Sequence, residues 1–305
     1  MPSVLAMPAL ALMLGCAQVR EHKSSPDPSD AAAMKKAMRR KDEIVFLSSP
    51  ELDARKPVLL LLHGATDNPA EMNGIVRAFR EKYNVLLYAY NYHQPIKKVG
   101  ADFVKELKLL REQMKKRDAE NLTVVTYSYS ASVFRQAVLQ ADQPALFANV
   151  SLIQLVPTAA GSYLARSLKN PIGAWFTGLA SKPSAVENPY GHIAAELWGQ
   201  SGSGKFYEMI PERHVYSILI EDDLHSVARI QDPEIQRRYH NGIGDNVVVI
   251  PKSTGVSHEY FPNDPVALEY LRKVLDAIPA TAASDRVRLA TGGQGEKSIN
   301  EGTRK

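Results

Sequence analysis

The sequence predicts an α/β fold, in which helices cover both faces of a mostly parallel central sheet. Three observations lead to this prediction. Short apolar runs rich in Val, Ile, Leu and Tyr recur along the chain from residue 43 onward. These runs are continuously apolar rather than alternating, as in strands that are buried on both faces. Segments with helical spacing lie between them, and strands that alternate with helices form parallel βαβ units.

The predicted strands are the apolar runs themselves. Each is short, and turn-forming or polar residues separate it from the helical segment that follows. In chain order the runs are 43–47 (EIVFL), 57–64 (PVLLLLHG), 84–90 (NVLLYAY), 122–127 (LTVVTY), 149–156 (NVSLIQLV), 214–220 (HVYSILI) and 246–250 (NVVVI).

Three segments show the apolar period of an amphipathic helix. In 101–117 the residues Phe103, Leu107, Leu110 and Met114 recur three or four positions apart, and Lys and Arg occupy the other face. The same period recurs after the fourth strand, in SVFRQAVLQA, and after the last strand, in PVALEYLRKVLDAI.

The remaining segments suggest one folded domain over 43–280 with flanking regions. Residues 17–42 are polar and then basic, which is typical of a tether. The stretch from about 157 to 213 contains both tryptophans and is too long for a simple crossover, so we expect an insertion over the carboxyl edge of the sheet. Residues 281–305 have little apolar surface to bury and are expected to be disordered.

Composition excludes several classes of protein. A chain of 305 residues with 45% hydrophobic and 23% charged residues is neither wholly disordered nor collagenous. Cys16 is the single cysteine, so the chain forms no internal disulfide and holds no thiolate zinc cluster. The net charge of +4 comes from scattered basic residues and gives no indication of a nucleic-acid partner.

Residues 1–16 (MPSVLAMPALALMLGC) are uncharged and mostly apolar, and they are shorter than the roughly 20 residues of a membrane span. They resemble a bacterial lipoprotein signal peptide, with Gly15 before a lipid-bearing Cys16, although no Lys or Arg precedes the apolar stretch. This resemblance implies membrane anchoring through Cys16, and Ala17 is typical of outer-membrane lipoproteins that face the periplasm or the cell surface. An incidental cysteine after a mis-assigned start is the alternative.

A serine-rich turn follows the fourth predicted strand and leads directly into a helix. Its sequence, Ser128-Tyr129-Ser130-Ala131-Ser132, resembles the G-x-S-x-G nucleophile elbow of the α/β-hydrolase fold, with serines in place of both glycines. Small residues two before and two after the nucleophile let strand and helix approach each other in that fold. The resemblance implies that Ser130 is the nucleophile.

Two backbone N–H groups are candidates for an oxyanion hole. The second predicted strand ends in His63-Gly64, which resembles the HG segment of lipases and esterases. In those enzymes the N–H of the next residue, here Ala65, joins the N–H of the residue after the nucleophile, here Ala131, to stabilise the oxyanion. Neither role depends on the side chain.

The general base and its acid partner follow from their positions in the chain. His258 lies after the last predicted strand and before the last helix, where the α/β-hydrolase fold carries its base. The acid belongs after the preceding strand, where Asp223 is preferred and Asp222 is a near alternative. Asp245 is a third candidate. The resulting order of Ser, Asp and His along the chain is that of the α/β-hydrolases.

Two further segments resemble lipases. Residues 156–165 (VPTAAGSYLA) are similar to a T-P-x-x-G-S-x-x-A stretch, and 203–209 (SGKFYEM) are similar to a segment of the lid. The resemblance implies the α/β-hydrolase fold with a helical or loop lid insertion, and a lipase- or esterase-like serine hydrolase without metal or organic cofactor. Its expected partners are a small-molecule or lipid ester with an apolar acyl chain and, through Cys16, the membrane.

Three alternatives remain open at the level of the sequence. A thioesterase or amidase of the same fold uses the same catalytic residues. A non-catalytic envelope lipoprotein could retain the fold as a binding module, since both glycines of the elbow are replaced. The insertion with Trp175 and Trp198 fits a mobile lid and a permanently packed cap equally well. The sequence does not indicate an oligomeric state.

Overall fold

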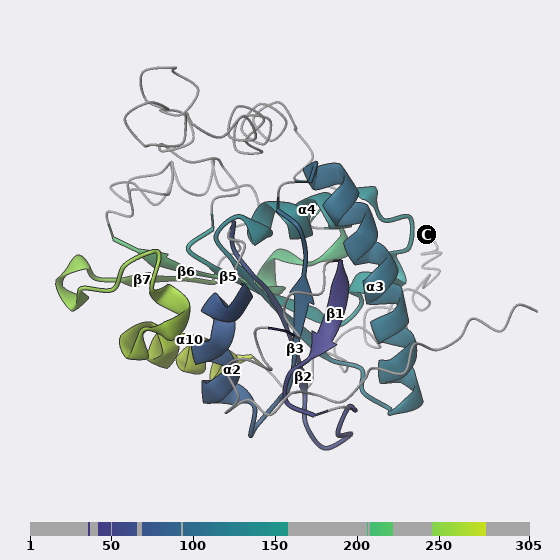
Figure 1. Cartoon of the computed structure of the whole chain (residues 1–305), viewed down its shortest axis with the longest axis horizontal. Coiled ribbons are helices and arrows are strands. Elements are labelled where there is room, and N and C mark those ends of the chain that lie inside the picture. The colour runs from purple at the N-terminus through teal and green to yellow at the C-terminus, as the bar shows by residue number, and fades with distance from the viewer. Residues whose placement is uncertain are drawn as a thin grey trace, which may run out of the picture.

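The computed structural model describes residues 36, 42–49, 51–65, 69–92, 94–157, 206, 208–221 and 246–278. The expected signal peptide, most of the tether and of the insertion, and the whole C-terminal tail lie outside these residues. Within them the chain forms a central sheet with helices packed on both sides (Figure 1).

The sheet has seven strands in the order β1-β3-β2-β4-β5-β6-β7. The first strand runs antiparallel to β3, and all other neighbouring pairs are parallel. Every predicted apolar run forms one of these strands, so the mostly parallel sheet is confirmed. The strands are β1 (Glu43–Phe46), β2 (Val58–Leu62), β3 (Asn84–Ala89), β4 (Leu122–Tyr127), β5 (Val150–Leu155), β6 (Val215–Ile220) and β7 (Asn246–Ile250).

Helices cover both faces, as predicted. The helices α3 (Ile96–Lys116) and α4 (Ser130–Gln140) lie on one face, and α2 (Asn73–Phe79) and α10 (Pro265–Ala277) lie on the other (Figure 1). The core is correspondingly divided in two. Alternate strand residues such as Leu60 pack with α3 and α4, and their neighbours such as Leu61 pack with α2 and α10.

Short 3-10 helices lie between these strands and helices. They are η1 (Pro69–Met72), η2 (Pro144–Phe147), η5 (Glu212–His214), η6 (Lys252–Thr254) and η7 (Phe261–Asn263). Both α2 and η1 are absent from the sequence prediction, because a helix of seven residues is too short to display a clear apolar period. The helix α3 also begins earlier than predicted, at Ile96 directly after Pro95.

The last strand differs from the prediction of burial on both faces. In β7 the side chains of Val247 and Val249 are exposed, whereas Ile250 is fully buried. The strand lies at the end of the described sheet order, next to β6 alone. A continuous apolar run therefore does not by itself show that a strand at the edge of a sheet is buried on both faces.

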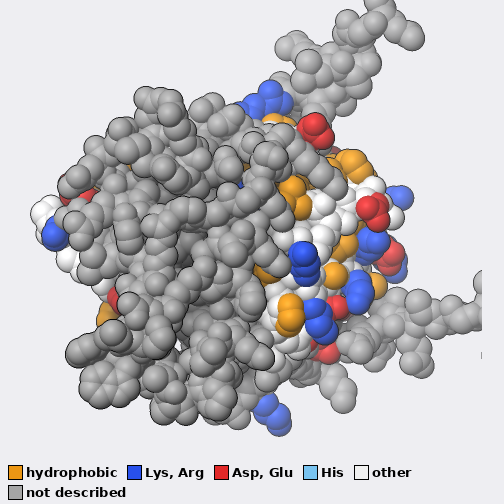
Figure 2. Space-filling view, turned by 90° about the horizontal axis from the view of Figure 1, so that it is seen from above, with side chains coloured by type: hydrophobic (Ala, Val, Ile, Leu, Met, Phe, Trp, Pro, Cys, Tyr) orange, Lys and Arg blue, Asp and Glu red, His pale blue; other side chains and the backbone are white. Residues whose placement is uncertain are grey.

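Charged side chains of both signs share the described surface. Among the side chains that Figure 2 colours by type, basic, acidic and apolar ones are interspersed. On α3, for example, Asp102 forms ion pairs with Lys98 at 2.6 Å and with Lys105 at 2.8 Å. In the part of the chain that the structure describes, no helix is long and apolar enough to cross a membrane.

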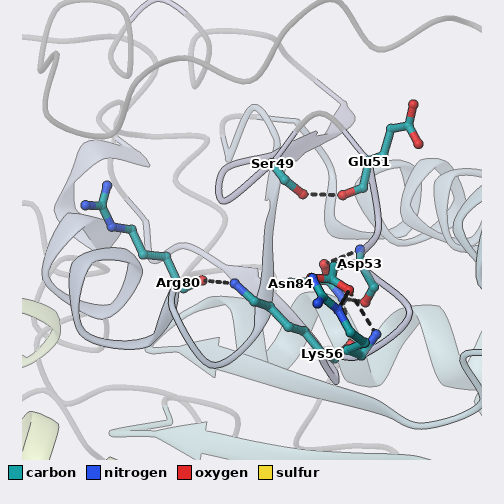
Figure 3. Close-up of polar contacts among 7 residues, drawn as sticks. Ser49, Glu51, Asp53, Lys56, Arg80 and Asn84 are labelled. Atoms are coloured by element: carbon teal, nitrogen blue, oxygen red, sulfur yellow. Dashed lines mark hydrogen bonds and ion pairs between the residues drawn. The ribbon is translucent and has the colours of Figure 1, made fainter.

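A polar clamp holds the amino end of β3. The buried Asn84 side chain accepts a hydrogen bond from Asp53 N–H at 2.8 Å and donates to the carbonyls of Asp53 and Lys56 (Figure 3). Arg55 donates to the Asp53 carboxylate and thereby lowers the pKa of Asp53 to about 2. These bonds lie at the amino edge of the sheet. The loops that carry the candidate site lie at the opposite, carboxyl edge.

Candidate active site

The turn between β4 and α4 holds Ser128 in a left-handed backbone conformation. Its φ is 53°, which side-chain-bearing residues rarely adopt and which is found where surrounding structure enforces it. The Ser128 N–H donates to the Leu155 carbonyl at 2.9 Å and so ties the turn to β5. Ser128 directly follows the last residue of β4, and Tyr129 is the N-cap of α4. The sharp strand-to-helix turn predicted from the sequence is therefore present, with Ser128 at its strained position.

His258 contacts Ser128 across the carboxyl edge of the sheet. The His258 Nε2 atom lies 2.8 Å from Ser128 Oγ, although the two residues are 130 positions apart. Both residues are buried, with exposed fractions of 8% for His258 and 7% for Ser128. When the imidazole carries its proton on Nδ1, Nε2 accepts a hydrogen bond from the serine hydroxyl. A general base must lie within this hydrogen-bond distance of the nucleophile that it deprotonates, so the contact is compatible with such a pair.

The structure does not bring the predicted nucleophile, Ser130, to His258. Ser130 is fully buried, and its Oγ accepts a hydrogen bond from Tyr127 N–H at 2.8 Å. The same oxygen lies 2.8 Å from the Leu62 carbonyl and 2.9 Å from the Tyr127 carbonyl, to either of which its proton can be donated. The Ser130 hydroxyl therefore joins the turn to β2.

The sequence contained a signal for the other serine. Serines alternate through this turn, so small residues flank either candidate: Thr126 and Ser130 lie two positions on either side of Ser128, and both are fully buried. The predicted strand ends at Tyr127, however, and the nucleophile of an elbow sits in the turn directly after its strand. The end of the strand favours Ser128, whereas the symmetric placement of Ser128 and Ser132 around Ser130 favours Ser130.

The HG segment forms a closely bonded loop after β2. His63 is fully buried and stacks on Tyr90 with ring centroids 4.2 Å apart. The Tyr90 N–H donates to His63 Nε2 at 3.2 Å, and the Tyr90 hydroxyl donates to the His63 carbonyl at 2.6 Å. Because Nε2 is an acceptor, the imidazole carries its proton on Nδ1, which lies 2.8 Å from the Gly64 carbonyl and donates to it.

These contacts orient the peptide bond that contains the predicted oxyanion donor. In a trans peptide the carbonyl and the N–H point in opposite directions. The Gly64 carbonyl is turned toward His63, so the Ala65 N–H is directed away from that ring. The Gly64 N–H donates to Glu71 Oε1 at 2.9 Å, which holds the loop from the other side.

The second predicted oxyanion donor has a partner inside the turn. The Ala131 N–H donates to the Ser128 carbonyl at 3.3 Å, in the first turn of α4. Ala131 is the predicted donor because it lies one residue after Ser130. The residue that follows Ser128 is Tyr129, so the N–H at the equivalent position belongs to Tyr129.

The loop that carries His258 is docked on the start of α2. The Asn263 side chain accepts from Gly74 N–H at 2.9 Å and donates to the Glu71 carbonyl at 2.8 Å. A Cβ atom on Gly74 would come within 2.2 Å of the Pro262 carbonyl oxygen, so only glycine allows this approach. The segment 71–74 thus supports both the HG loop, through the Glu71 carboxylate, and the His258 loop.

The candidate acids Asp222, Asp223 and Asp245 lie outside the described residues, as do Cys16 and the aromatic part of the insertion. The chain is described up to Glu221, whose N–H donates to the Ile250 carbonyl at 3.0 Å. Its carboxylate accepts from Lys252 N–H at 2.9 Å. The end of β6 is therefore bonded to the segment that leads toward His258. Among the described residues no group of three or more His, Cys, Asp or Glu side chains is arranged to bind a metal ion.

Comparisons with known proteins give a likeness of structure and not of sequence. The sequence matches no family model and no curated protein. The mature form of a Bacillus licheniformis lipase, BlEst2, superposes with a TM-score of 0.51 at 12% identity over 77% of this chain and 99% of the lipase. For a lipase-esterase related protein of Clostridium acetobutylicum the TM-score is 0.48 at 15% identity over 77% of this chain and 98% of that protein. The sheet topology and the first of these superpositions lead to the same conclusion: the chain has the α/β-hydrolase fold.

Proposed function

We propose that this protein is a serine hydrolase that cleaves carboxylic esters, with Ser128 as nucleophile and His258 as general base. The observation that carries the proposal is the 2.8 Å contact between His258 Nε2 and Ser128 Oγ. The left-handed backbone of Ser128 in the turn after β4 supports it independently. This replaces the assignment of Ser130, whose hydroxyl is bonded to backbone groups.

The proposed reaction proceeds through an acyl-enzyme. Ser128 Oγ bonds to the ester carbonyl carbon as its proton passes to His258 Nε2, and the carbonyl electrons move onto the oxygen. The tetrahedral intermediate collapses, the C–O bond to the alcohol breaks, and the alcohol leaves with the proton from Nε2. Water then attacks the acyl-enzyme with His258 again as base, which releases the carboxylic acid and restores Ser128.

In this scheme the N–H groups of Ala65 and Tyr129 bind the oxyanion. The His63 contact to the Gly64 carbonyl supports the choice of Ala65, because it fixes the orientation of the 64–65 peptide. Tyr129 replaces Ala131, whose N–H is bonded to the Ser128 carbonyl. Two such preorganised donors stabilise the developing charge by several kcal/mol, about 3 to 4 kcal/mol for each donor.

Asp223 remains our proposal for the acid that orients the His258 imidazole. The bond between Glu221 and Ile250 supports an acid just after β6, because the chain leaves the sheet there beside the segment that leads to His258. Asp223→Asn is expected to lower kcat by about 10⁴-fold through loss of the correct tautomer. Asp222→Asn and Asp245→Asn are the matched controls, and a comparable loss in either one with near-normal activity in Asp223→Asn would reassign the acid.

Labelling with a fluorophosphonate probe tests the nucleophile. We expect the probe to modify the wild type and Ser130→Ala but not Ser128→Ala, with circular dichroism confirming that both variants are folded. Labelling that persists in Ser128→Ala and disappears in Ser130→Ala would return the role to Ser130. A wild type that is never labelled would instead favour a non-catalytic binding module.

The proposed substrate is an ester with an apolar acyl chain. The lipase-like segments of the sequence support this choice, and the Bacillus licheniformis protein of the same fold is named as a lipase. In a panel of p-nitrophenyl esters of increasing chain length, with matched thioesters and amides, kcat/KM should be highest for the longer esters. A preference for the thioesters or amides would support the other hydrolase classes.

We also propose that a lipid on Cys16 anchors the protein in the bacterial cell envelope, and that the mature protein is an outer-membrane lipoprotein. The uncharged apolar segment 1–16 with Gly15 before Cys16 supports this. Mass spectrometry of the N-terminus of protein purified from membranes should detect an acylated Cys16, and Cys16→Ala should appear in the soluble fraction. An unmodified Met1 on the membrane-bound protein would contradict the proposal.

A further inference from the structure

We infer that Tyr127 is a positioning residue that connects the nucleophile, the general base and the oxyanion loop. The inference rests on the proposed function, since it assigns Tyr127 a part in the same reaction. Tyr127 is the last residue of β4 and directly precedes Ser128, and its side chain is 3% exposed. It therefore belongs to the rigid sheet and to the site at once.

The first connection runs to the general base. The Tyr127 hydroxyl donates a hydrogen bond to the backbone carbonyl of His258 at 2.5 Å, across 131 positions of the chain. The two rings lie beside each other, with centroids 5.7 Å apart. The bond engages the backbone of His258 and not its imidazole ring, whose Nε2 contacts Ser128.

The second connection runs to the oxyanion loop. A Cβ atom at Gly64 would approach Cδ1 and Cε1 of the Tyr127 ring to 3.0 Å, so the ring packs directly on the Gly64 backbone. This is the residue whose carbonyl contacts His63 and whose N–H contacts Glu71. The Tyr127 ring therefore packs on the backbone that immediately precedes Ala65.

The third connection is the backbone of Tyr127 itself. Its N–H donates to Ser130 Oγ at 2.8 Å, and Ser130 Oγ in turn lies 2.8 Å from the Leu62 carbonyl at the end of β2. The residue before the nucleophile is thereby fixed to the strand that leads into the oxyanion loop. One side chain and one peptide unit consequently set the relative positions of all three parts.

This arrangement matters because His258 lies on a connecting segment between β7 and α10, not on a strand or an α-helix. Displacement of a reacting group by about 1 Å can reduce the rate about 10²-fold. A hydroxyl that ties the His258 backbone to β4 limits such displacement. Loss of the bond should therefore lower kcat and leave KM nearly unchanged, since Tyr127 is buried beneath the groups that react.

Tyr127→Phe tests the inference because it removes the hydroxyl and retains the ring against Gly64. The matched control is Tyr88→Phe: Tyr88 is also fully buried in the sheet, and its hydroxyl donates to the Val99 carbonyl at 3.3 Å, away from His258. We expect Tyr127→Phe to lower kcat about 10-fold to 100-fold at unchanged KM, by the same factor at every pH. Tyr88→Phe should retain the wild-type kcat. Wild-type kcat in Tyr127→Phe, or an equal loss in both variants, would overturn the inference.

A second measurement separates failure of this inference from failure of the proposed function. In protein with ¹⁵N-labelled histidine, the ring signals of His258 should shift or broaden in Tyr127→Phe and stay in place in Tyr88→Phe, with assignment by His258→Gln. Unchanged His258 signals in Tyr127→Phe would overturn the inference even in a chain without esterase activity. Absence of fluorophosphonate labelling in the wild type would remove the proposed function, and the histidine signals would then decide the part played by Tyr127.

Discussion

Two serines that are two positions apart have different environments. Ser128 has a left-handed backbone and contacts His258, whereas Ser130 is bonded to backbone groups of Tyr127 and Leu62. In an elbow, glycine usually occupies the position two residues after the nucleophile, because a side chain there would crowd the strand. Ser130 occupies this position when Ser128 is taken as the nucleophile. Here the side chain is accommodated and satisfies a backbone N–H, so the elbow gains a bond that glycine cannot form.

Ser130→Ala should therefore destabilise the protein without abolishing labelling of Ser128. The substitution leaves the buried Tyr127 N–H without its acceptor, which costs about 1 to 3 kcal/mol of unfolding free energy. Urea unfolding followed by fluorescence measures the difference. The control is Ser132→Ala: Ser132 is also fully buried, and its hydroxyl has no hydrogen-bond partner among the described residues, so its removal should be close to neutral. An equal loss of unfolding free energy in the two variants would contradict this prediction.

Among the elements, two adjacent contacts hold the segment that follows His258. In the first, Gly74 of α2 lies against Pro262 and Asn263 of η7. In the second, at the start of α10, Asp264 is the N-cap and accepts from Val266 N–H at 2.8 Å and Ala267 N–H at 3.1 Å. These contacts to α2 and to the start of α10 restrict the positions that the backbone of His258 can adopt.

Gly74→Ala should displace this segment. The added Cβ would lie 2.2 Å from the Pro262 carbonyl oxygen, which is backbone and cannot rotate away. We expect a loss of unfolding free energy of about 1 to 3 kcal/mol together with a fall in kcat, measured by thermal unfolding and ester hydrolysis. A variant with wild-type stability and wild-type kcat would mean that the α2 contact does not support the site.

Asp264→Ala should weaken α10 by removal of its cap. The expected cost is about 1 kcal/mol, because two N–H groups of the first turn lose their acceptor. Asp264→Asn is the matched control and should retain most of the stability, since asparagine caps helices about as well as aspartate. If Asn were as destabilising as Ala in chemical denaturation, the charge of Asp264 and not its capping bond would be responsible.

At the scale of the whole molecule, the sheet separates two apolar cores, one with α3 and α4 and one with α2 and α10. Tyr88 is fully buried in the first core. Burial raises the pKa of its phenol well above the usual value of 10, and the nearby carboxylates of Asp42, Asp102 and Glu106 act in the same direction. The Tyr88 phenol therefore ionises more readily in the unfolded chain than in the folded chain.

The sign of the pH dependence follows from this raised pKa. Below pH 10 the Tyr88 phenol is neutral in both the folded and the unfolded chain, and its contribution to stability is fully present. Above pH 10 the unfolded chain releases the proton and the folded chain does not, so the unfolding free energy falls by up to about 1.4 kcal/mol per pH unit. Urea unfolding at pH 8 to 11 should show a smaller fall for Tyr88→Phe than for the wild type. If the unfolding free energy fell equally with pH in both proteins, Tyr88 would not be the group responsible for the fall.

The apolar pattern of the sequence is sufficient to predict the architecture and the edge of the sheet at which the candidate site lies. Continuous apolar runs predict buried parallel strands, and parallel strands bring their carboxyl ends to one edge. For this reason the loops that carry His63, His258 and the serine turn could be assigned to a common edge before any contact was known. The short helix α2 and the exposed face of β7 were not predicted, because seven residues carry too weak a period and an apolar run does not reveal its place in the sheet order.

The serine that contacts His258 is identified by tertiary contacts. Serines alternate along the turn and have the same chemistry, so their spacing permits either register, and only the end of β4 at Tyr127 favours Ser128. The choice is made by the Leu155 carbonyl, which bonds Ser128 N–H, and the Leu62 carbonyl, which lies beside Ser130 Oγ. Both belong to neighbouring strands that are distant in the chain. The bond from Tyr127 to His258 likewise spans 131 positions. Contacts of this kind depend on how strands and loops pack against one another, and no local sequence pattern encodes that packing.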